Sequence, residues 1–189
     1  HWGYVYADQA GTAPLPILTV SATGPAAIGF PATSTITYTY SYMNSTGVAT
    51  DDTTVIAVLP KTFDNKDTTF NSYNAGPTIC TTPAVGVTGT VSCNFGTLAP
   101  GQTGTFTITV NVPADASTIS PNNVVTHGSY TIQATGLAPV TGAKVVTTLN
   151  AQVAAVNPVP TLSQWGMILM AALLAVMALL QLPLKNRRS

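Results

Sequence analysis

Two segments of the chain alternate strictly between apolar and polar residues, residues 33–44 and residues 104–113. This period of two is the pattern of a β-strand with one face in a core and the other in water. The apolar positions are Ile36, Tyr38, Tyr40 and Tyr42 in the first segment, and Phe106, Ile108, Val110 and Val112 in the second. Both segments are therefore predicted to be half-buried antiparallel strands.

Shorter runs of β-branched and aromatic residues predict further strands between these two, before them and after them. The runs lie near residues 15–22, 53–59, 68–73, 88–95, 124–135 and 144–154. Turn signals rich in Gly, Pro and Asn separate them. About eight short strands with this spacing are typical of two packed sheets. We therefore predict an all-β fold, an immunoglobulin-like antiparallel β-sandwich over residues 15–154, preceded by an extension over residues 1–14.

Residues 163–184 break the β pattern because they are almost wholly apolar. A helix of this length would measure about 33 Å, close to the bilayer core of about 30 Å. The basic tail follows it with Lys185, Arg187 and Arg188. The positive-inside rule places such a tail in the cytoplasm. We therefore predict a C-terminal hydrophobic α-helix in a unit over 163–189, joined to an exported sandwich by a proline-containing linker over 155–162.

Composition leaves little room for chemistry. The chain has six acidic residues, all Asp, six basic residues, two His, two Cys and 32 Thr, with a net charge of zero. So few titratable groups disfavour an enzyme, and we expect no catalytic residues, no cofactor and no metal site. Without a basic field, we also expect no nucleic acid partner.

The residues that could carry chemistry have structural interpretations. Because the compartment outside the cytoplasm is oxidising, Cys80 and Cys93 are predicted to form a disulfide. His127 is interpreted as a surface or turn residue. The acidic residues near 51–52 and 64–67 are interpreted as solvated turn residues, because the second group lacks the Gly and the distal Glu of a calcium loop.

Residues 38–60 and 91–114 resemble the bacterial surface repeat domain of unknown function known as DUF11. The parts that carry the resemblance are the turn from Asn44 to Gly47, the strand end Leu59-Pro60, Cys93, and the turn from Gly96 to Gly101. The resemblance covers about residues 20–150. It implies an extracellular sandwich that serves as a spacer, stalk or surface module, and it implies no catalytic residues.

A second resemblance lies at the C-terminus, where a short motif precedes the apolar helix and the basic tail. The motif residues are Val159, Pro160, Thr161, Leu162, Ser163, Gln164, Trp165 and Gly166. This order resembles the IPTL-type C-terminal sorting signal of Gram-negative bacteria, with Val159 where Ile is usual and Gln164 where Glu is usual. It implies export and recognition at the membrane by an exosortase-like sorting enzyme. Whether the helix is cleaved stays open.

Two further features suggest contacts between copies of the chain. Trp2, Tyr4 and Tyr6 alternate, as in a strand that could pair with the sheet edge of a neighbour, although a frayed terminus is the alternative. Ala171, Ala175 and Ala178 form a stripe of small residues, which lets apolar helices approach closely. The alternative is a plain anchor with alanine present by composition.

These observations favour a non-enzymatic structural subunit of an extracellular bacterial surface assembly, such as a filament, sheath or coat. Its main partner would be another copy of the chain. It would be held in the membrane, at least transiently, through residues 163–184. The alternative is a monomeric membrane-anchored surface module or adhesin.

Overall fold

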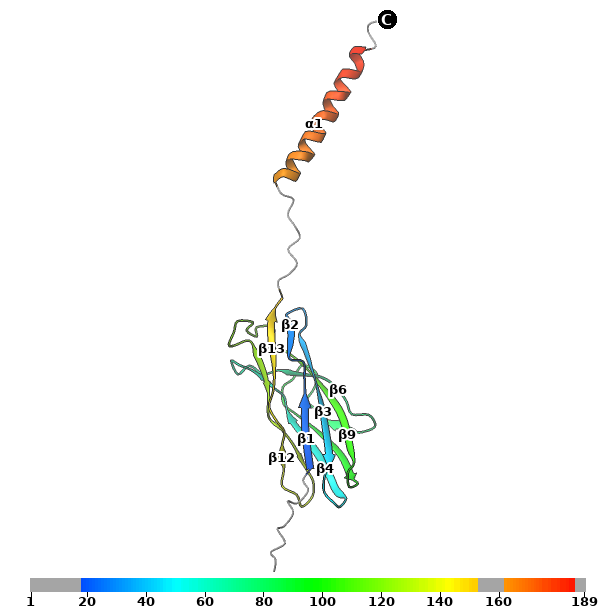
Figure 1. Cartoon of the computed structure of the whole chain (residues 1–189), viewed down its shortest axis with the longest axis vertical. Helices are drawn as coiled ribbons and strands as arrows, with labels where there is room; N and C mark the ends of the chain where they lie inside the picture. Colours follow the sequence, from blue (N-terminus) through cyan, green and yellow to red (C-terminus); the bar gives the residue numbers. More distant parts are fainter. Residues whose placement is uncertain (1–17, 153–161, 186–189) are drawn as a thin grey trace, which may run out of the picture. The chain divides into compact units, whose positions relative to one another are not determined.

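The structure, a computed structural model, describes residues 18–152 and 162–185. The chain divides between Gln152 and Val153 into two units, and each is described by itself. The first range holds a β-sandwich and the second holds the helix α1, Leu162–Lys185 (Figure 1).

The sandwich contains 13 strands within residues 18–152. In chain order they are β1 Leu18–Thr23, β2 Ala27–Phe30, β3 Thr35–Asn44, β4 Thr50–Val58, β5 Lys61–Thr62, β6 Thr69–Asn74, β7 Cys80–Thr81, β8 Thr90–Leu98, β9 Thr103–Asn111, β10 Val124–His127, β11 Tyr130–Gln133, β12 Val140–Thr141 and β13 Val145–Ala151. All eight predicted strand regions contain strands. The additional strands, β2, β5, β7 and β12, have two to four residues each, too few to show a period of two in the sequence.

The first sheet has the strand order β1-β3-β9-β6, and all of its pairs are antiparallel. β3 and β9 pair along nearly their whole length, so that Tyr38 lies opposite Ile108 and Tyr40 opposite Phe106. These four side chains are buried, as the alternation predicts. The threonines between them face outward, partly or fully exposed to solvent.

The other layer is divided into two short sheets that continue one another. Their orders are β2-β13-β10-β5 and β12-β11-β4-β8-β7. β4 pairs with β11 and its chain continuation β5 pairs with β10, while the Val58 N–H donates to the Ser129 carbonyl at the break. The region 124–135, predicted as one strand, is therefore two strands. Three hydrogen-bonded sheets thus form two layers.

The breaks in this layer have identifiable local causes. Pro60, between β4 and β5, has no N–H to donate to a ladder. On the neighbouring strand, the Tyr130 ring fills the space beside Gly142, where a Cβ would lie 1.9 Å from a ring carbon. Gly142 therefore permits the close approach of the aromatic ring that ends β12.

One strand pair departs from the predicted antiparallel arrangement. β2 runs parallel to β13, with Ala27 opposite Thr148 and Phe30 opposite Ala151. A parallel pair requires a long connection, and here nearly the whole sandwich lies between the two strands. The pairing is therefore invisible to local sequence patterns.

Helix α1 has 24 residues, rich in the strong helix formers Leu, Met and Ala. It confirms the helix predicted over 163–184. Among the residues that the structure describes, no helix is both long and apolar enough to cross a membrane. The described side chains of α1 extend from Trp165 to Leu179, shorter than the about 20 residues a span requires. The prediction of a membrane span over 163–184 is therefore not supported.

The inward face of β9 can be tested with a pair of substitutions on one strand. Ile108 is 1 % exposed, so Ile108→Asp buries an unpaired charge and should destabilise the fold by more than about 4 kcal/mol. Thr105→Asp, on the exposed outer face of the same strand, is the matched control and should change stability little. Denaturant unfolding of both variants measures the difference. A larger loss for Thr105→Asp would show that the two faces are reversed.

Candidate functional site

Cys80 and Cys93 form the predicted disulfide, with a Cα–Cα distance of 4.2 Å. The two residues lie directly opposite each other where β7 pairs with β8. Both are buried in the core, at 7 % and 0 % exposure. The disulfide therefore fastens the two-residue edge strand β7 to the sheet, which two backbone pairs alone would hold weakly.

Asn44 joins the two segments on which the DUF11 resemblance depends. Its buried side-chain amide donates to the carbonyl of Leu98 at 2.8 Å and to that of Val48 at 3.0 Å. Its side-chain carbonyl accepts from the backbone N–H of Thr46 at 2.9 Å. Asn44 thus closes its own turn and attaches it to the end of β8, which is a structural role.

A buried cluster of aromatic and polar side chains links the two layers. The Tyr40 hydroxyl on β3 lies 2.6 Å from Nε2 of His127 on β10. The Tyr40 ring also meets the Tyr130 ring edge-on, with centroids 5.5 Å apart. His127 is 1 % exposed, so its interpretation as a surface or turn residue was wrong. The alternation of the strand could have indicated this burial, because His127 lies two residues after the apolar Val125 and therefore on the same face.

Burial dominates the electrostatics of this cluster. It lowers the pKa of His127 to about 4 and raises the pKa of Tyr38 to about 12. At neutral pH all members are uncharged. Among the described residues, the Tyr38 hydroxyl and Nδ1 of His127 have no hydrogen-bond partner. Both residues are almost fully buried, at 0 % and 1 % exposure, and the cluster packs the two layers against each other.

The acidic residues near 64–67 are engaged by lysines. Lys66 Nζ lies 2.9 Å from the carboxylate of Asp64 and 3.0 Å from that of Asp115, so an ammonium group already lies between these carboxylates. Hydrogen bonds from Thr62 and Lys66 lower the pKa of Asp64. Lys61 pairs with Asp67 at 3.0 Å. Within residues 18–152 and 162–185, no three His, Cys, Asp or Glu side chains are grouped as metal ligands.

The outer face of the first sheet is uniform in chemistry. It consists of Thr, Ser and Asn side chains from four strands, with Met43 as its one apolar member among the outward positions of β1, β3, β9 and β6. None of the eight charged residues in 18–152 belongs to this sheet. The face is therefore polar but without charge, a property that composition alone cannot locate.

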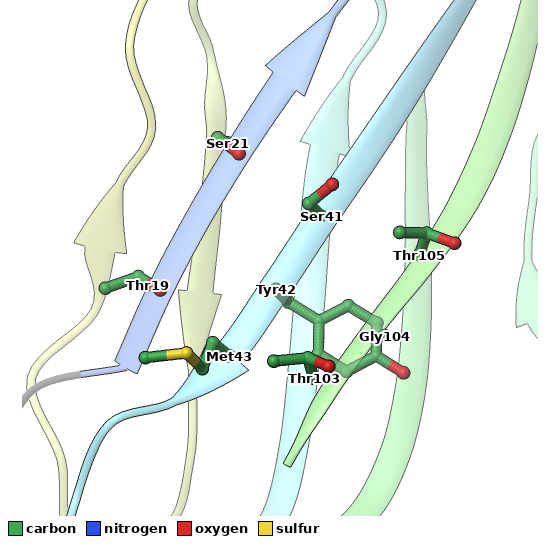
Figure 2. A pocket seen from close by; sticks show the side chains of 8 residues that line it. All are labelled: Thr19, Ser21, Ser41, Tyr42, Met43, Thr103, Gly104 and Thr105. Atoms are coloured by element: carbon green, nitrogen blue, oxygen red, sulfur yellow. The ribbon is translucent and has the colours of Figure 1, made fainter. Parts of the chain in front are cut away.

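A depression of about 460 Å³ lies at one end of this face (Figure 2). Side chains from β1, β3 and β9 surround it, and its lining is Thr19, Ser21, Ser41, Tyr42, Met43, Thr103, Gly104 and Thr105. From the core side, the Tyr42 ring lies across Gly104, where a Cβ would be 2.2 Å from the Tyr42 hydroxyl. Gly104 therefore allows this ring to support the strand pair beneath the depression. No local sequence pattern marks this depression, because its residues come from three strands.

Several predicted residues lie outside the described part of the chain. They are Trp2, Tyr4 and Tyr6, the motif residues Val159, Pro160 and Thr161, and Arg187 and Arg188. Ala171, Ala175 and Ala178 lie in α1, at spacings that put them on one side of the helix, and all three are exposed. Leu162, Ser163, Gln164, Trp165 and Gly166 form the first turn of α1, and Lys185 ends it.

Comparison with protein families confirms the C-terminal resemblance. Residues 157–188 match the IPTL-CTERM motif. This motif suggests export to the cell surface. The resemblance of the sandwich to DUF11 domains stays a prediction. No curated protein matches the chain.

Several solved structures are similar to the sandwich at low identity. The cohesin module of a family 33 glycoside hydrolase from Clostridium perfringens has 7 % identity and a TM-score of 0.49, with 72 % of this chain and 99 % of that one covered. The CBM3 of Hungateiclostridium clariflavum has 14 % identity and a TM-score of 0.34, with 67 % and 99 % covered. A GH20 exo-β-N-acetylglucosaminidase from Vibrio harveyi has 10 % identity and a TM-score of 0.36, with 72 % and 19 % covered. Likeness at this level does not extend to function.

The disulfide should contribute measurably to stability. Its two cysteines are 13 positions apart in the sequence, so its loss should lower the free energy of unfolding by about 3 kcal/mol. The double variant Cys80→Ala/Cys93→Ala and the reduced wild-type chain should show the same loss in denaturant unfolding. Non-reducing peptide mapping should recover the linked pair, and two alkylatable thiols in the oxidised protein would contradict the structure.

His127 should make stability depend on pH. In the unfolded chain its pKa is near 6.5 and in the folded chain about 4, so between these values the unfolded state binds more protons. Stability is therefore complete above pH 6.5 and falls by about 3 kcal/mol as the pH drops toward 4. His127→Gln keeps a polar partner for Tyr40 but does not titrate, so its profile should lack this component. Identical pH profiles for the two proteins would place His127 in solvent.

Proposed function

We propose that this chain is a non-enzymatic structural subunit of an extracellular bacterial surface assembly. The observation that carries the proposal is the match of residues 157–188 to the IPTL-CTERM motif, which suggests export to the cell surface. The sandwich adds a rigid, disulfide-fastened body. Its only buried histidine is enclosed by tyrosines rather than presented to a substrate.

The apolar tail would act at two stages. During export, residues 163–184 would hold the chain at the membrane, with Lys185, Arg187 and Arg188 on the cytoplasmic side. A sorting enzyme of the exosortase type would recognise the motif that starts at Val159. Support comes from the described side chains of α1, residues 165–179, which are exposed and almost all apolar.

Assembly would then use the same helix. Ala171, Ala175 and Ala178 are spaced four and three residues apart, so they present one small-residue side on which a second helix packs closely. Exposed leucines and methionines flank this side. Packing of tails from several copies would remove their apolar surface from water.

The alternative function is a monomeric anchored module or adhesin. The observation that favours it is the uncharged outer face of the first sheet, a large and uniform surface available to a ligand.

A tail variant with a matched control tests the assembly. Ala175→Leu keeps the helix apolar but blocks close approach, so it should leave export unchanged and reduce multimers at least tenfold. Val176→Leu also enlarges an apolar side chain, but about 100° around the helix from Ala175, and should assemble normally. Export is measured by protease accessibility on intact cells, and multimers by negative-stain microscopy and light scattering of shed protein.

Two results would count against this proposal. If the chain truncated after Gln152 is retained at the surface as well as the full chain, the tail does not hold it. If shed wild-type protein is monomeric, the alternative of a single anchored module replaces assembly.

A further inference from the structure

Charge is segregated on the sandwich. The charged residues of 18–152 lie on β4 and β5, in the segments that follow β5 and β9, and directly before β13; they are Asp51, Asp52, Lys61, Asp64, Lys66, Asp67, Asp115 and Lys144. β1, β3, β9 and β6 carry none. A ligand of either sign would therefore find no counter-charge on the first sheet, whereas an uncharged ligand meets no unpaired charge to desolvate.

The register aligns the outer side chains into rows that run across the strands. Ser21 of β1 lies opposite Ser41 of β3, which lies opposite Thr105 of β9. The adjacent row is Thr19, Met43 and Thr103. Neighbouring strands are about 4.8 Å apart, and successive rows about 6.7 Å, so the rows form a two-dimensional array. These two rows surround the depression, and we call them the open rows (Figure 2).

The two ends of the outer face differ in how their polar groups are used. At the far end the groups bond each other: Thr37 with Thr109 at 2.9 Å, and Asn71 with Asn111 at 2.9 Å. In the open rows, none of the five hydroxyls is hydrogen-bonded to another described residue. Their donors and acceptors are therefore available at the depression, whereas Thr37, Asn71, Thr109 and Asn111 use theirs within the face.

The edges of this sheet are less available than its face. On β1, the N–H of Ala22 donates to the Tyr130 hydroxyl at 3.0 Å. On β6, the backbone of Phe70 bonds with Gly86 and Val87 at 2.8 and 2.9 Å. Part of the hydrogen-bonding capacity of both edges is thus already used within the sandwich, which disfavours strand addition at these positions. Recognition by the first sheet would therefore use its outer face.

We propose that the open rows bind a neutral polysaccharide. The five hydroxyls donate to and accept from sugar hydroxyls, each being able to do both. Met43, 37 % exposed, and the threonine methyls contact the C–H faces of the sugar rings. The absence of charge on this face favours an uncharged ligand, and its hydroxyls favour a polymer that is itself rich in hydroxyls. This binding goes beyond the structural role proposed above and does not depend on assembly.

A second copy of the chain is the competing occupant of this face, and the chemistry is less favourable to it. Interfaces between proteins obtain most of their affinity from large aromatic and Arg side chains, while Ser and Thr contribute little. The outward positions of the four strands carry neither an aromatic residue nor Arg.

Affinity electrophoresis of the full-length chain tests the proposal. Native gels would contain hydroxyethylcellulose, dextran or galactomannan as neutral probes, and carboxymethylcellulose as the charged counterpart of the first. The detergent must lack a sugar headgroup, since that group would compete. We expect at least one neutral polymer to retard the chain, and carboxymethylcellulose to retard it less than hydroxyethylcellulose does.

The variant Ser41→Ala/Thr103→Val/Thr105→Val removes three hydroxyls with little change in shape. Each neutral hydrogen bond is modest, so the apparent affinity should fall roughly tenfold. The matched control, Thr90→Val/Thr141→Val, removes exposed hydroxyls from the other layer and should bind as the wild-type chain does. Melting temperatures of both variants confirm that each is folded.

Four results would overturn the proposal. They are no retardation by any of the neutral polymers, retardation by carboxymethylcellulose equal to that by hydroxyethylcellulose, an unchanged affinity of the triple variant, and an equal loss in the control variant. Sedimentation without polysaccharide adds a fifth: if the triple variant loses self-association that the wild-type chain shows, the occupant is a second copy.

Discussion

The antiparallel pairing of β3 with β9 is the constraint on which both surfaces of the first sheet depend. Nine residue pairs run from Thr35–Asn111 to Met43–Thr103 without a register shift. Because side chains alternate, this one register sends the Tyr, Phe, Ile and Val side chains into the core and aligns hydroxyls on the outside. A slip by one residue would exchange the two faces, so the core and the outer array are consequences of the same pairing.

The polar core limits how the second layer packs on the first. Tyr40 stacks on Phe106 within its own sheet, at 4.7 Å between ring centroids, and its hydroxyl meets His127 of the other layer. A hydrogen bond is directional, and a buried hydroxyl without a partner is costly, so this contact specifies the offset between layers more narrowly than apolar packing does. Tyr130 adds a second link, since its hydroxyl donates to Ala143 and accepts from Ala22.

Features that depend on residues close together in the sequence were predictable, and features that depend on distant residues were not. The faces of β3 and β9 and the C-terminal helix were predictable because their signals are local. The disulfide was predictable because only one pair of cysteines exists.

The pairing of β2 with β13 was not predictable, because the paired residues lie more than 100 positions apart in the sequence. The division of the second layer was not predictable either, because it depends on how the Tyr130 ring fits beside Gly142. His127 was misinterpreted because the adjacent Gly128 indicates a turn, whereas the strand ends only after the histidine side chain has entered the core. The depression could not be predicted, since the rows across β1, β3 and β9 exist only once the register is known.

The positions of the few charged residues determine which part of the sandwich surface is uncharged. In the sandwich, Lys66 and Lys61 are placed against carboxylates, so five of the eight charged residues pair with one another near β5. The outer face of the first sheet carries no charge, so its contacts depend on shape and hydrogen bonds. Hydrogen bonds between uncharged groups are individually weak, so affinity for such a face must come from repetition. A polymer that offers many equivalent hydroxyls supplies repetition on one side. An array of subunits assembled through their tails would supply it on the other, which makes assembly and weak glycan contacts mutually reinforcing properties of one surface protein.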